Sequence, residues 1–326
     1  NMSLKKYIPT ISRFAGALLL LMVFAFITRL FSFSVTTEEK ADDSDAIYRE
    51  YISKNYKIYS LAMPEGLTFA KEKVPLQDID VRERLDRELI INTYWHSSTM
   101  FNFKRANRWF PVMEKVLKDE DIPEDFKYLS MIESGFENVV SPAGAAGYWQ
   151  FLKMTAIKYN LEVNDFVDER YHVEKSTRAA AAYLREANAY FDNWTLTAAS
   201  YNMGIGGVQQ RLKEQKVKSY YDLMLVPETY RYVFRILAAK EIYENPRFYG
   251  FNVRFKDMYI PFETETVVVD STINDLAEYA LKKGVNYKIL KILNPWLRAN
   301  KLPVRAGKKY EILFPTKDFP LTTIEP

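Results

Sequence analysis

The residue with the clearest capacity for acid–base chemistry is Glu133, which follows a stripe of apolar residues in one predicted helix. The helix is expected to span Pro123–Ser134, because proline suits a first helical turn and Gly135 suits a helix end. Phe126 and Leu129 precede Glu133 by seven and four residues, a spacing that places the three side chains on one helix face. The carboxylate is therefore expected at the edge of a core, in the last turn of its helix.

A carboxyl group in this position is expected to have a raised pKa. Partial burial and the negative end of the helix dipole both disfavour the ionised form. A glutamic acid that stays protonated near neutral pH can act as a general acid. The alternative is a boundary glutamate that reaches solvent, and the helix considered by itself favours that alternative.

Two later loops carry groups that suit a polar ligand. Residues 141–150 are mostly small and end in an aromatic pair and an amide. Small residues allow close backbone approach, while Trp149 could stack on a sugar and Gln150 could hydrogen-bond to it. A helix–helix turn with Trp149 in the core is the alternative. Tyr201 and Asn202 stand at an expected helix end, where they can donate to a ligand or cap the helix.

The composition excludes several kinds of site. The chain has no cysteine and only two histidines, His96 and His172, far apart in the sequence. Disulfides, thiolate metal sites and a cysteine nucleophile are therefore excluded, and a histidine metal site is not expected. A net charge of +3 is too small to predict nucleic-acid binding. We expect neither a metal nor an organic cofactor.

The chain is expected to be mainly α-helical, with a change to strand-like pattern near residue 250. Its first residues combine a basic flank with an apolar run, which predicts a membrane anchor or signal segment. The predicted divisions are an anchor or signal segment (1–35), a linker or tether (36–80), a helical catalytic domain (81–250), a linker (251–265), a small α+β module (266–316) and a tail (317–326).

Three motifs, in this order, resemble those of the family 1 lytic transglycosylases: Glu133-Ser134, Gly147-Tyr-Trp-Gln150 and Ser200-Tyr-Asn202. The resemblance continues into Glu228–Val233. It implies a lysozyme-like (goose-type) helical domain in which Glu133 is the catalytic acid/base. The residues expected to line or support its glycan-binding cleft are Ser134, Ser141, Trp149, Gln150, Tyr201, Asn202, Glu228 and Tyr232.

The chemistry of this family explains why no second carboxylate is evident beside Glu133. Most glycosidases use a pair, whereas Glu137 lies beyond Gly135 and is interpreted as a surface residue. The resemblance implies that Glu133 protonates the oxygen between N-acetylmuramic acid and N-acetylglucosamine, while the substrate's acetamido group stabilises the positive centre. Glu133 then takes the muramoyl C6 hydroxyl proton as a 1,6-anhydro ring closes. A hydrolytic muramidase and a non-catalytic wall-binding scaffold are the alternatives.

The C-terminal module resembles a LysM domain, a small fold that binds glycans containing N-acetylglucosamine. Its residues 267–315 contain nine Lys/Arg against four Asp/Glu, which suits a polymer with carboxylate-bearing peptides; a solvated surface is the alternative. The expected partners are peptidoglycan strands and a membrane, with an envelope protein complex as a further candidate. The basic N-terminal flank predicts a periplasmic protein anchored in the inner membrane by an uncleaved segment, or one released after cleavage.

Overall fold

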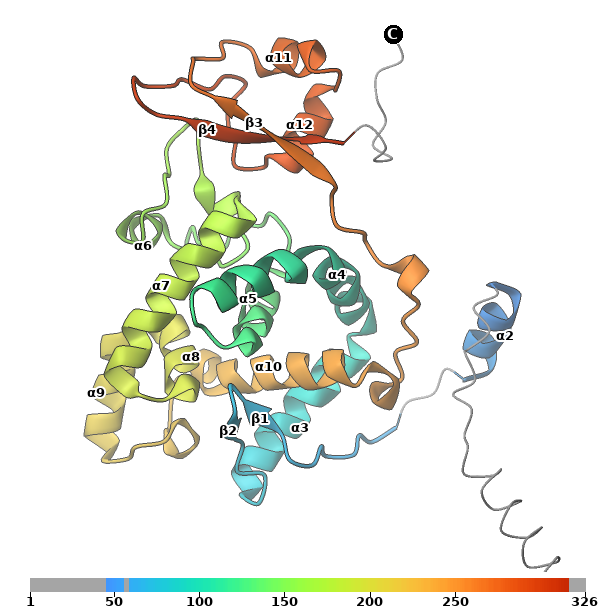
Figure 1. Cartoon of the computed structure of the whole chain (residues 1–326). Coiled ribbons are helices and arrows are strands. Elements are labelled where there is room, and N and C mark those ends of the chain that lie inside the picture. The colour runs from blue at the N-terminus through green and yellow to red at the C-terminus, as the bar shows by residue number, and fades with distance from the viewer. Residues whose placement is uncertain (1–44, 56–58, 317–326) are drawn as a thin grey trace, which may run out of the picture. The chain divides into compact units, whose positions relative to one another are not determined.

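The computed structural model describes residues 45–55 and 59–316 (Figure 1). The chain divides into two units, Asn1–Ile58 and Tyr59–Pro326. The described part of the first unit is helix α2 (Asp45–Asn55), which lies inside the segment predicted as a linker. The predicted anchor at 1–35 lies outside the described residues. Within the described ranges, no helix has the length and apolar character needed to span a bilayer.

The second unit begins with a helical region. Its regular elements are β1 (Thr68–Phe69), β2 (Glu72–Lys73), α3 (Ile79–Tyr94), α4 (His96–Asp119), α5 (Lys127–Ser134), α6 (Lys153–Lys158), α7 (Val173–Phe191), α8 (Trp194–Met203), α9 (Ile205–Gln215) and α10 (Pro227–Glu244). Short 3₁₀ helices lie at Glu124–Phe126, Glu169–Tyr171, Tyr220–Asp222, Pro246–Tyr249 and Phe255–Asp257. The mainly helical prediction is confirmed. The helix predicted for Pro123–Ser134 is divided, since its first turn is the 3₁₀ helix before α5.

Helix α10 runs below α5 in the view of Figure 1. It begins with Pro227 in its first turn and packs against α3, α5 and α8. Val233, Ile236 and Leu237 are completely buried, so its inward face contributes apolar surface to the core that these helices share. Tyr232 lies on the same helix and is also buried.

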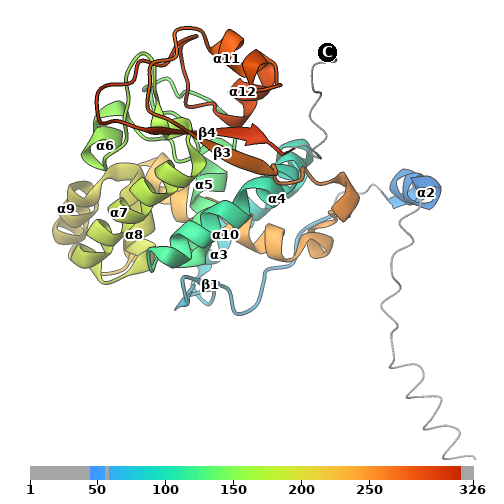
Figure 2. The ribbon, with the colours of Figure 1, turned by 45° about the horizontal axis from the view of Figure 1, so that its top comes forward.

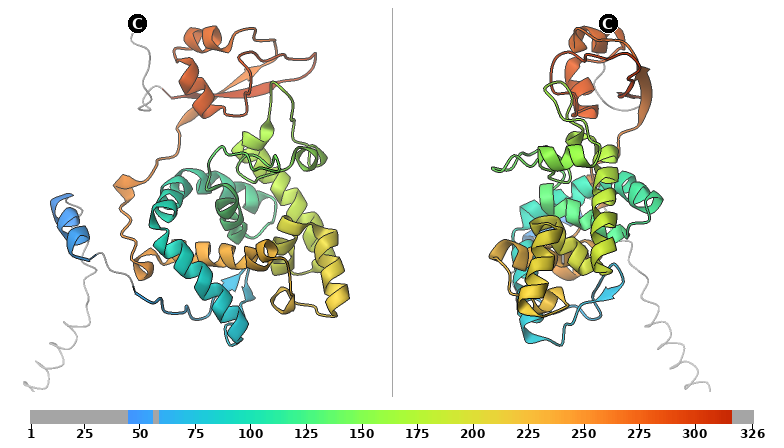
Figure 3. Two further views of the ribbon diagram at one scale, coloured as in Figure 1. Left: turned by 180° about the vertical axis from the view of Figure 1, so that it is seen from behind. Right: turned by 90° about the vertical axis from the view of Figure 1, so that its left-hand side faces the viewer.

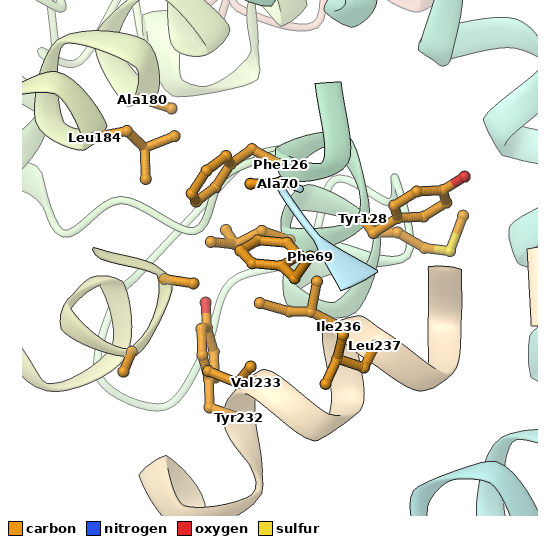
Figure 4. Packing of buried hydrophobic residues seen from close by; sticks show 14 of the residues in the cluster. Phe69, Ala70, Phe126, Tyr128, Ala180, Leu184, Tyr232, Val233, Ile236 and Leu237 are labelled. Atoms are coloured by element: carbon orange, nitrogen blue, oxygen red, sulfur yellow. The ribbon is translucent and has the colours of Figure 1, made fainter. Parts of the chain in front are cut away.

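The residues just before α3 belong to the helical core, which corrects the predicted limit at residue 81. Strands β1 and β2 form an antiparallel hairpin with Phe69 opposite Glu72. The Phe69 ring is completely buried, 5.1 Å from the Phe126 ring between centroids, and Figure 4 shows it between Phe126 and α10. Asp125 accepts hydrogen bonds from the backbone N–H of Ala70 and from Lys240 Nζ, both at 2.7 Å. The hairpin is therefore a fixed part of the domain.

Helices α7, α8 and α9 pack beside one another (Figure 2). Helix α8 ends at Met203 and its cap Gly204 has a φ of 81°, so the predicted position of Tyr201 and Asn202 at a helix end is confirmed. The connection from α8 to α9 is short, because α9 begins at Ile205 and includes Gly206 and Gly207.

The C-terminal module contains β3 (Thr264–Val269), α11 (Leu276–Lys282), α12 (Tyr287–Leu293) and β4 (Tyr310–Pro315). The strands pair antiparallel from Thr264 opposite Pro315 to Val269 opposite Tyr310, and both helices cover one side of them (Figure 3). This order of strand, helix, helix and strand fits the α+β module predicted for this part of the chain. Its first helix, α11, is capped by Asp275, whose side chain accepts from the backbone N–H groups of Ala277 and Glu278.

The C-terminal module is packed on a segment of the helical region, residues 162–171. Val167 forms a β-bridge with Leu297, and the Arg298 backbone N–H donates to the Phe166 carbonyl at 2.8 Å. The Tyr310 hydroxyl donates to Glu162 at 2.9 Å. A shared apolar cluster joins buried residues of the module to Ala146, Val167 and Tyr171.

The predicted linker at 251–265 is also held in place. Three side chains of α4 donate to its carbonyl groups: Lys104 to Asp257 at 2.8 Å, Asn107 to Tyr259 at 3.1 Å and Arg108 to Ile260 at 2.9 Å. These bonds fasten the segment along α4. The module is therefore joined to the helical region on two sides.

Candidate active site

Glu133 lies in the last turn of α5, as predicted. Gly135 caps the helix with a φ of 55°, and its N–H donates to the Met131 carbonyl at 2.9 Å. Leu129 and Ser130 are completely buried in the preceding turn, whereas Glu133 is half-buried. The side chain therefore stands where the core meets the surface.

Tyr232 of α10 donates a hydrogen bond from its hydroxyl to Glu133 Oε1. Its side chain is buried. Burial and the charge of Glu133 hold the pKa of Tyr232 well above its ordinary value, so the hydroxyl remains protonated and available as a donor. Because Tyr232 is rigidly packed, this bond also fixes where the Glu133 carboxyl points.

Two arginines occupy the carbonyl end of α5. Arg235 Nη2 donates to the Ile132 carbonyl at 2.9 Å, and Arg105 Nη1 donates to the Gly135 carbonyl at 3.3 Å. Their positive charges offset the partial negative charge of the helix end. The sequence predicted that burial and the helix end would both raise the pKa of Glu133, and these arginines reduce the contribution of the helix end.

Burial raises the pKa of Glu133, and this effect is the largest acting on the group. The hydrogen bond from Tyr232 and the charge of Arg235 oppose it, while the charge of Glu228 acts in the same direction as burial. A raised pKa of this kind favours the protonated form that a general acid needs.

Glu133 opens into a cleft of about 620 Å³. The cleft lies among α3, α4, α5 and the first half of α10. Its lining residues include Glu88, Trp95, Phe101, Arg105, Glu133, Ser134, Glu137, Glu228, Arg231 and Arg235. Its size and its mixture of charged, amide and aromatic groups suit a polar ligand.

Asn202 and Glu228 are brought together on one side of the site. Asn202 Nδ2 donates to Glu228 Oε1 at 3.2 Å, and the Thr229 hydroxyl donates to Asn202 Oδ1 at 2.6 Å. These bonds connect the end of α8 to the start of α10. Glu228 lines the cleft, whereas Asn202, which is not among the lining residues, holds its carboxylate by this hydrogen bond.

Tyr201 lies behind Glu133. Its hydroxyl donates to the Trp149 carbonyl at 2.8 Å, and its ring packs against Tyr183 with centroids 5.1 Å apart. Burial first, and the charge of Glu133 next, raise its pKa well above the ordinary value. The structure thus brings Tyr201 within electrostatic reach of Glu133, with its hydroxyl used to hold the 141–150 loop.

Ser134 fastens that loop to α5. The hydroxyl groups of Ser130 and Ser134 both donate to the Tyr148 carbonyl at 2.9 Å, and Ser134 Oγ accepts from the Phe136 N–H at 3.0 Å. Ser134 is 8% exposed. Both hydrogen-bonding functions of its hydroxyl group are thus engaged within the protein, although Ser134 also lines the cleft. Its predicted contact with substrate remains a prediction.

Ser141 and Gln150 make hydrogen bonds within the loop. Ser141 Oγ accepts from the Ala145 N–H at 3.0 Å. Gln150, whose φ is 49°, donates from Nε2 to the carbonyls of Gly147 at 2.9 Å and Val139 at 3.2 Å. Their predicted roles in substrate binding remain predictions, and neither residue lines the cleft described above.

Trp149 does not stack on a ligand in this structure. Its side chain is completely buried, and its Nε1 donates to the Thr177 hydroxyl at 2.9 Å. A ring with no exposed face cannot receive a sugar, so the prediction of sugar stacking is wrong and the core alternative is correct. The residue anchors the loop to α7.

The sequence reasoning missed Arg105, Arg235, Trp95 and Phe101. Arg235 follows Tyr232 by three residues on one helix, so helical spacing could have found it. Arg105, Trp95 and Phe101 lie far from the recognised motifs and carry no local signal. In the part of the chain that the structure describes, no cluster of three or more His, Cys, Asp or Glu side chains is arranged to hold a metal ion.

Comparison with known families defines the class of domain that carries this site. Residues 111–224 match the transglycosylase SLT domain, and residues 265–318 match the soluble lytic transglycosylase C-terminal LysM-like domain. The chain therefore contains an SLT domain followed by a LysM-like domain. It is homologous to membrane-bound lytic murein transglycosylase D of Escherichia coli, with 30% identity over 243 residues that cover 73% of this chain and 52% of that protein. The chain thus spans about half the length of this curated relative.

Two solved structures were also found to be similar. One is the lytic transglycosylase Slt of Pseudomonas aeruginosa in an inactive mutant form, with 22% identity and a TM-score of 0.34 over 46% of this chain and 26% of that one. The other is the 70 kDa soluble lytic transglycosylase Slt70 of Escherichia coli, with 15% identity and a TM-score of 0.38 over 62% and 40% of the two chains.

Proposed function

We propose that this protein is a peptidoglycan lytic transglycosylase in which Glu133 is the single acid/base. The observation that carries the proposal is the environment of Glu133: a carboxyl group with a raised pKa, opening into a cleft and held by the Tyr232 hydroxyl. The SLT domain and the homology to a murein transglycosylase support the choice of substrate.

In the proposed reaction, Glu133 starts protonated and donates its proton to the oxygen that joins N-acetylmuramic acid to N-acetylglucosamine. The bond to muramoyl C1 breaks, and the substrate's acetamido group stabilises the positive centre. The Glu133 carboxylate then accepts the proton of the muramoyl C6 hydroxyl, whose oxygen bonds to C1. The 1,6-anhydro product forms without consuming water, and Glu133 returns to its starting state.

The neighbours of Glu133 suit both halves of this cycle. Burial and the Glu228 charge favour the protonated form that is needed first. The Tyr232 hydroxyl and the Arg235 charge favour the carboxylate that is needed second. The proposed cycle needs both protonation states of Glu133, and each state has neighbours that favour it.

The remaining site residues are assigned supporting roles in this proposal. Glu228 meets the substrate from the cleft, with Asn202 orienting its carboxylate. Gln150 and Ser141 shape the loop that borders the site, and Tyr201 holds that loop from below. The LysM-like domain would contact neighbouring sugars of the same polymer through its excess of basic residues.

Glu133→Gln tests the assignment, because glutamine keeps the shape but cannot donate the proton. We expect release of soluble fragments from purified peptidoglycan to fall by roughly 10²–10⁴-fold. Glu137→Gln is the matched control, since Glu137 also lines the cleft but pairs with Arg105. Full activity in Glu133→Gln would refute the assignment. Product masses distinguish anhydro ends from hydrolysed ends, which contain one additional water; hydrolysed ends would identify a muramidase.

We further propose that the protein acts in the periplasm and is held at the inner membrane by its N-terminal segment. The proposal rests on the basic flank and apolar run within residues 1–35. Membrane fractionation of cells expressing the full chain, compared with a chain that begins at residue 36, tests this location. Recovery of the full chain in the periplasmic fluid would contradict the anchor.

A further inference from the structure

Trp95 occupies an unusual position at the corner between α3 and α4. It caps the end of one helix and the beginning of the next, and it is 65% exposed. The other four tryptophans of the chain are buried or half-buried. An exposed indole leaves apolar area in water that burial would stabilise by about 25 cal/mol per Å². Such exposure marks a binding surface when polar groups surround it.

Trp95 lines the same cleft as Glu133, together with Phe101 from the next turn of α4. Phe101 is 44% exposed, and the Arg105 guanidinium lies 5.1 Å from its ring centroid. Asn92, Ser98 and Asn102 from the same corner also line the cleft. The corner therefore presents aromatic surface beside amide and hydroxyl groups.

The corner is close to the end of α5. A Cβ atom placed on Gly135 would lie 3.0 Å from Asn102 Oδ1, so this part of α4 touches the residue that ends the Glu133 helix. All of these corner residues precede residue 111, where the SLT match begins. They form a wall of the cleft that the shared domain does not include.

We propose that Trp95, together with Phe101 in the lining of the same cleft, forms a stacking subsite for a pyranose ring of the glycan strand, separate from the sugars joined by the cleaved bond. This inference rests on the proposed function. A pyranose ring has an apolar face of C–H groups and an edge of hydroxyl and acetamido groups. The aromatic surface matches the face, while Asn92, Ser98 and Asn102 can meet the edge.

The subsite supplies binding energy at a distance from the chemistry. Energy from remote parts of a substrate can hold the reacting bond in place beside the catalytic group. Trp95 is thus assigned to the recognition of long strands, and short fragments that do not reach it gain nothing from it.

Binding can be measured without turnover by placing the substitutions in the full-length Glu133→Gln protein. Isothermal titration calorimetry with the hexamer of N-acetylglucosamine measures the affinity. We expect about tenfold weaker binding for Trp95→Ala and nearly unchanged binding for Trp95→Phe. Tyr190→Ala is the matched control, because Tyr190 is 60% exposed on α7 and does not line the cleft. Its affinity should equal that of the parent.

Iodide quenching of tryptophan fluorescence gives a second, independent measurement. The quenchable fraction should fall when the hexamer binds, and this change should be lost in Trp95→Ala. Equal affinities in Trp95→Ala and the parent, or an unprotected Trp95 in the presence of the hexamer, would overturn the subsite. Thermal melting of each variant establishes that the fold is intact. Because Trp95→Phe keeps an aromatic ring, normal binding by this variant would show that the defect of Trp95→Ala comes from the missing ring and not from unfolding.

The subsite and the proposed reaction can fail separately. If Glu133→Gln still cleaves peptidoglycan, the acid/base assignment is wrong. If Glu133→Gln is inactive but Trp95→Ala binds the hexamer normally, the reaction stands and the subsite is wrong. Weaker hexamer binding by Trp95→Ala, together with a higher KM on long strands only, supports both.

Discussion

Replacing Tyr232 by phenylalanine would remove one hydroxyl group from the site and leave the buried ring in place. That hydroxyl donates to Glu133 Oε1, and the bond lowers the pKa of Glu133 against the larger effect of burial. Without this bond, the ionised form of Glu133 loses more stabilisation than the protonated form, because a hydrogen bond to a charged group is the stronger one. The pKa of Glu133 in Tyr232→Phe should therefore rise further.

The size of the rise follows from the strength of such bonds. A hydrogen bond to a charged group contributes about 1.5–3 kcal/mol to stability, and one between neutral groups contributes about 1 kcal/mol. The difference of about 1–2 kcal/mol corresponds to roughly one pKa unit. If the same energy is lost as the carboxylate forms, when Glu133 gives up its proton in the first step, the maximum rate should fall about tenfold.

The pH dependence of kcat/KM tests this reasoning, because it reports the ionisation of the free enzyme. Glu133 must be protonated at the start of the proposed cycle, so the alkaline limb of the profile should move up by about one pH unit in Tyr232→Phe. Tyr128→Phe is the matched control. Tyr128 is also buried and also donates to a carboxylate, Glu244 at 3.1 Å, but it does not line the cleft. An alkaline limb that stays in place or moves down would refute the account of Glu133.

Two further predictions concern stability. Gly147 has a φ of 79°, and a Cβ atom placed on it would lie 1.9 Å from the Arg170 carbonyl oxygen. Gly147→Ala should therefore lower the free energy of unfolding by roughly 2–5 kcal/mol. A loss below about 1 kcal/mol in urea unfolding would contradict the contact. Burial lowers the pKa of His172 to about 4 from 6.5, so the folded state favours the neutral ring and stability is lost as the pH falls from about 6.5 towards 4. By about pH 5 the loss should reach about 2 kcal/mol, and His172→Asn, which can still cap α7, should remove that loss; an unchanged pH dependence of unfolding would show that His172 is not responsible.

The part of the site that depends on local spacing could be predicted from the sequence. Glu133 was expected in a last helical turn from the positions of Phe126, Leu129 and Gly135, and the structure has it there. Helical periodicity is a local property, so one short segment contains all of the information it needs. The end of α8 at Tyr201 and Asn202 was predicted for the same reason.

Long-range partners could not be predicted in this way. Tyr232 is 99 residues from Glu133, and only its place in a recognised motif suggested that the two meet. Arg105 and Arg235 approach α5 from two different helices, and no pattern within either helix indicates this. Contacts between distant segments depend on how the helices pack, which periodicity does not specify.

Other errors came from residues with two reasonable environments. Trp149 beside small residues could have been a sugar platform or a core residue, and its hydrogen bond to Thr177 decides between them. The β1–β2 hairpin was missed because its turn uses Ala70 and Lys71 at φ values of 49° and 68°. Turns with this geometry are usually recognised by glycine or asparagine, and neither is present.

The apolar cluster shared by the two domains changes what a truncated protein would mean. Removing the C-terminal domain would uncover Val167 and Tyr171, and also Ala146, which belongs to the loop fastened to the Glu133 helix. A chain shortened in this way would therefore lose support beneath the 141–150 loop together with any glycan contact that the C-terminal domain makes. Reduced activity after such a deletion would not by itself measure glycan binding, and single surface substitutions in the intact chain are the sounder way to separate the two contributions.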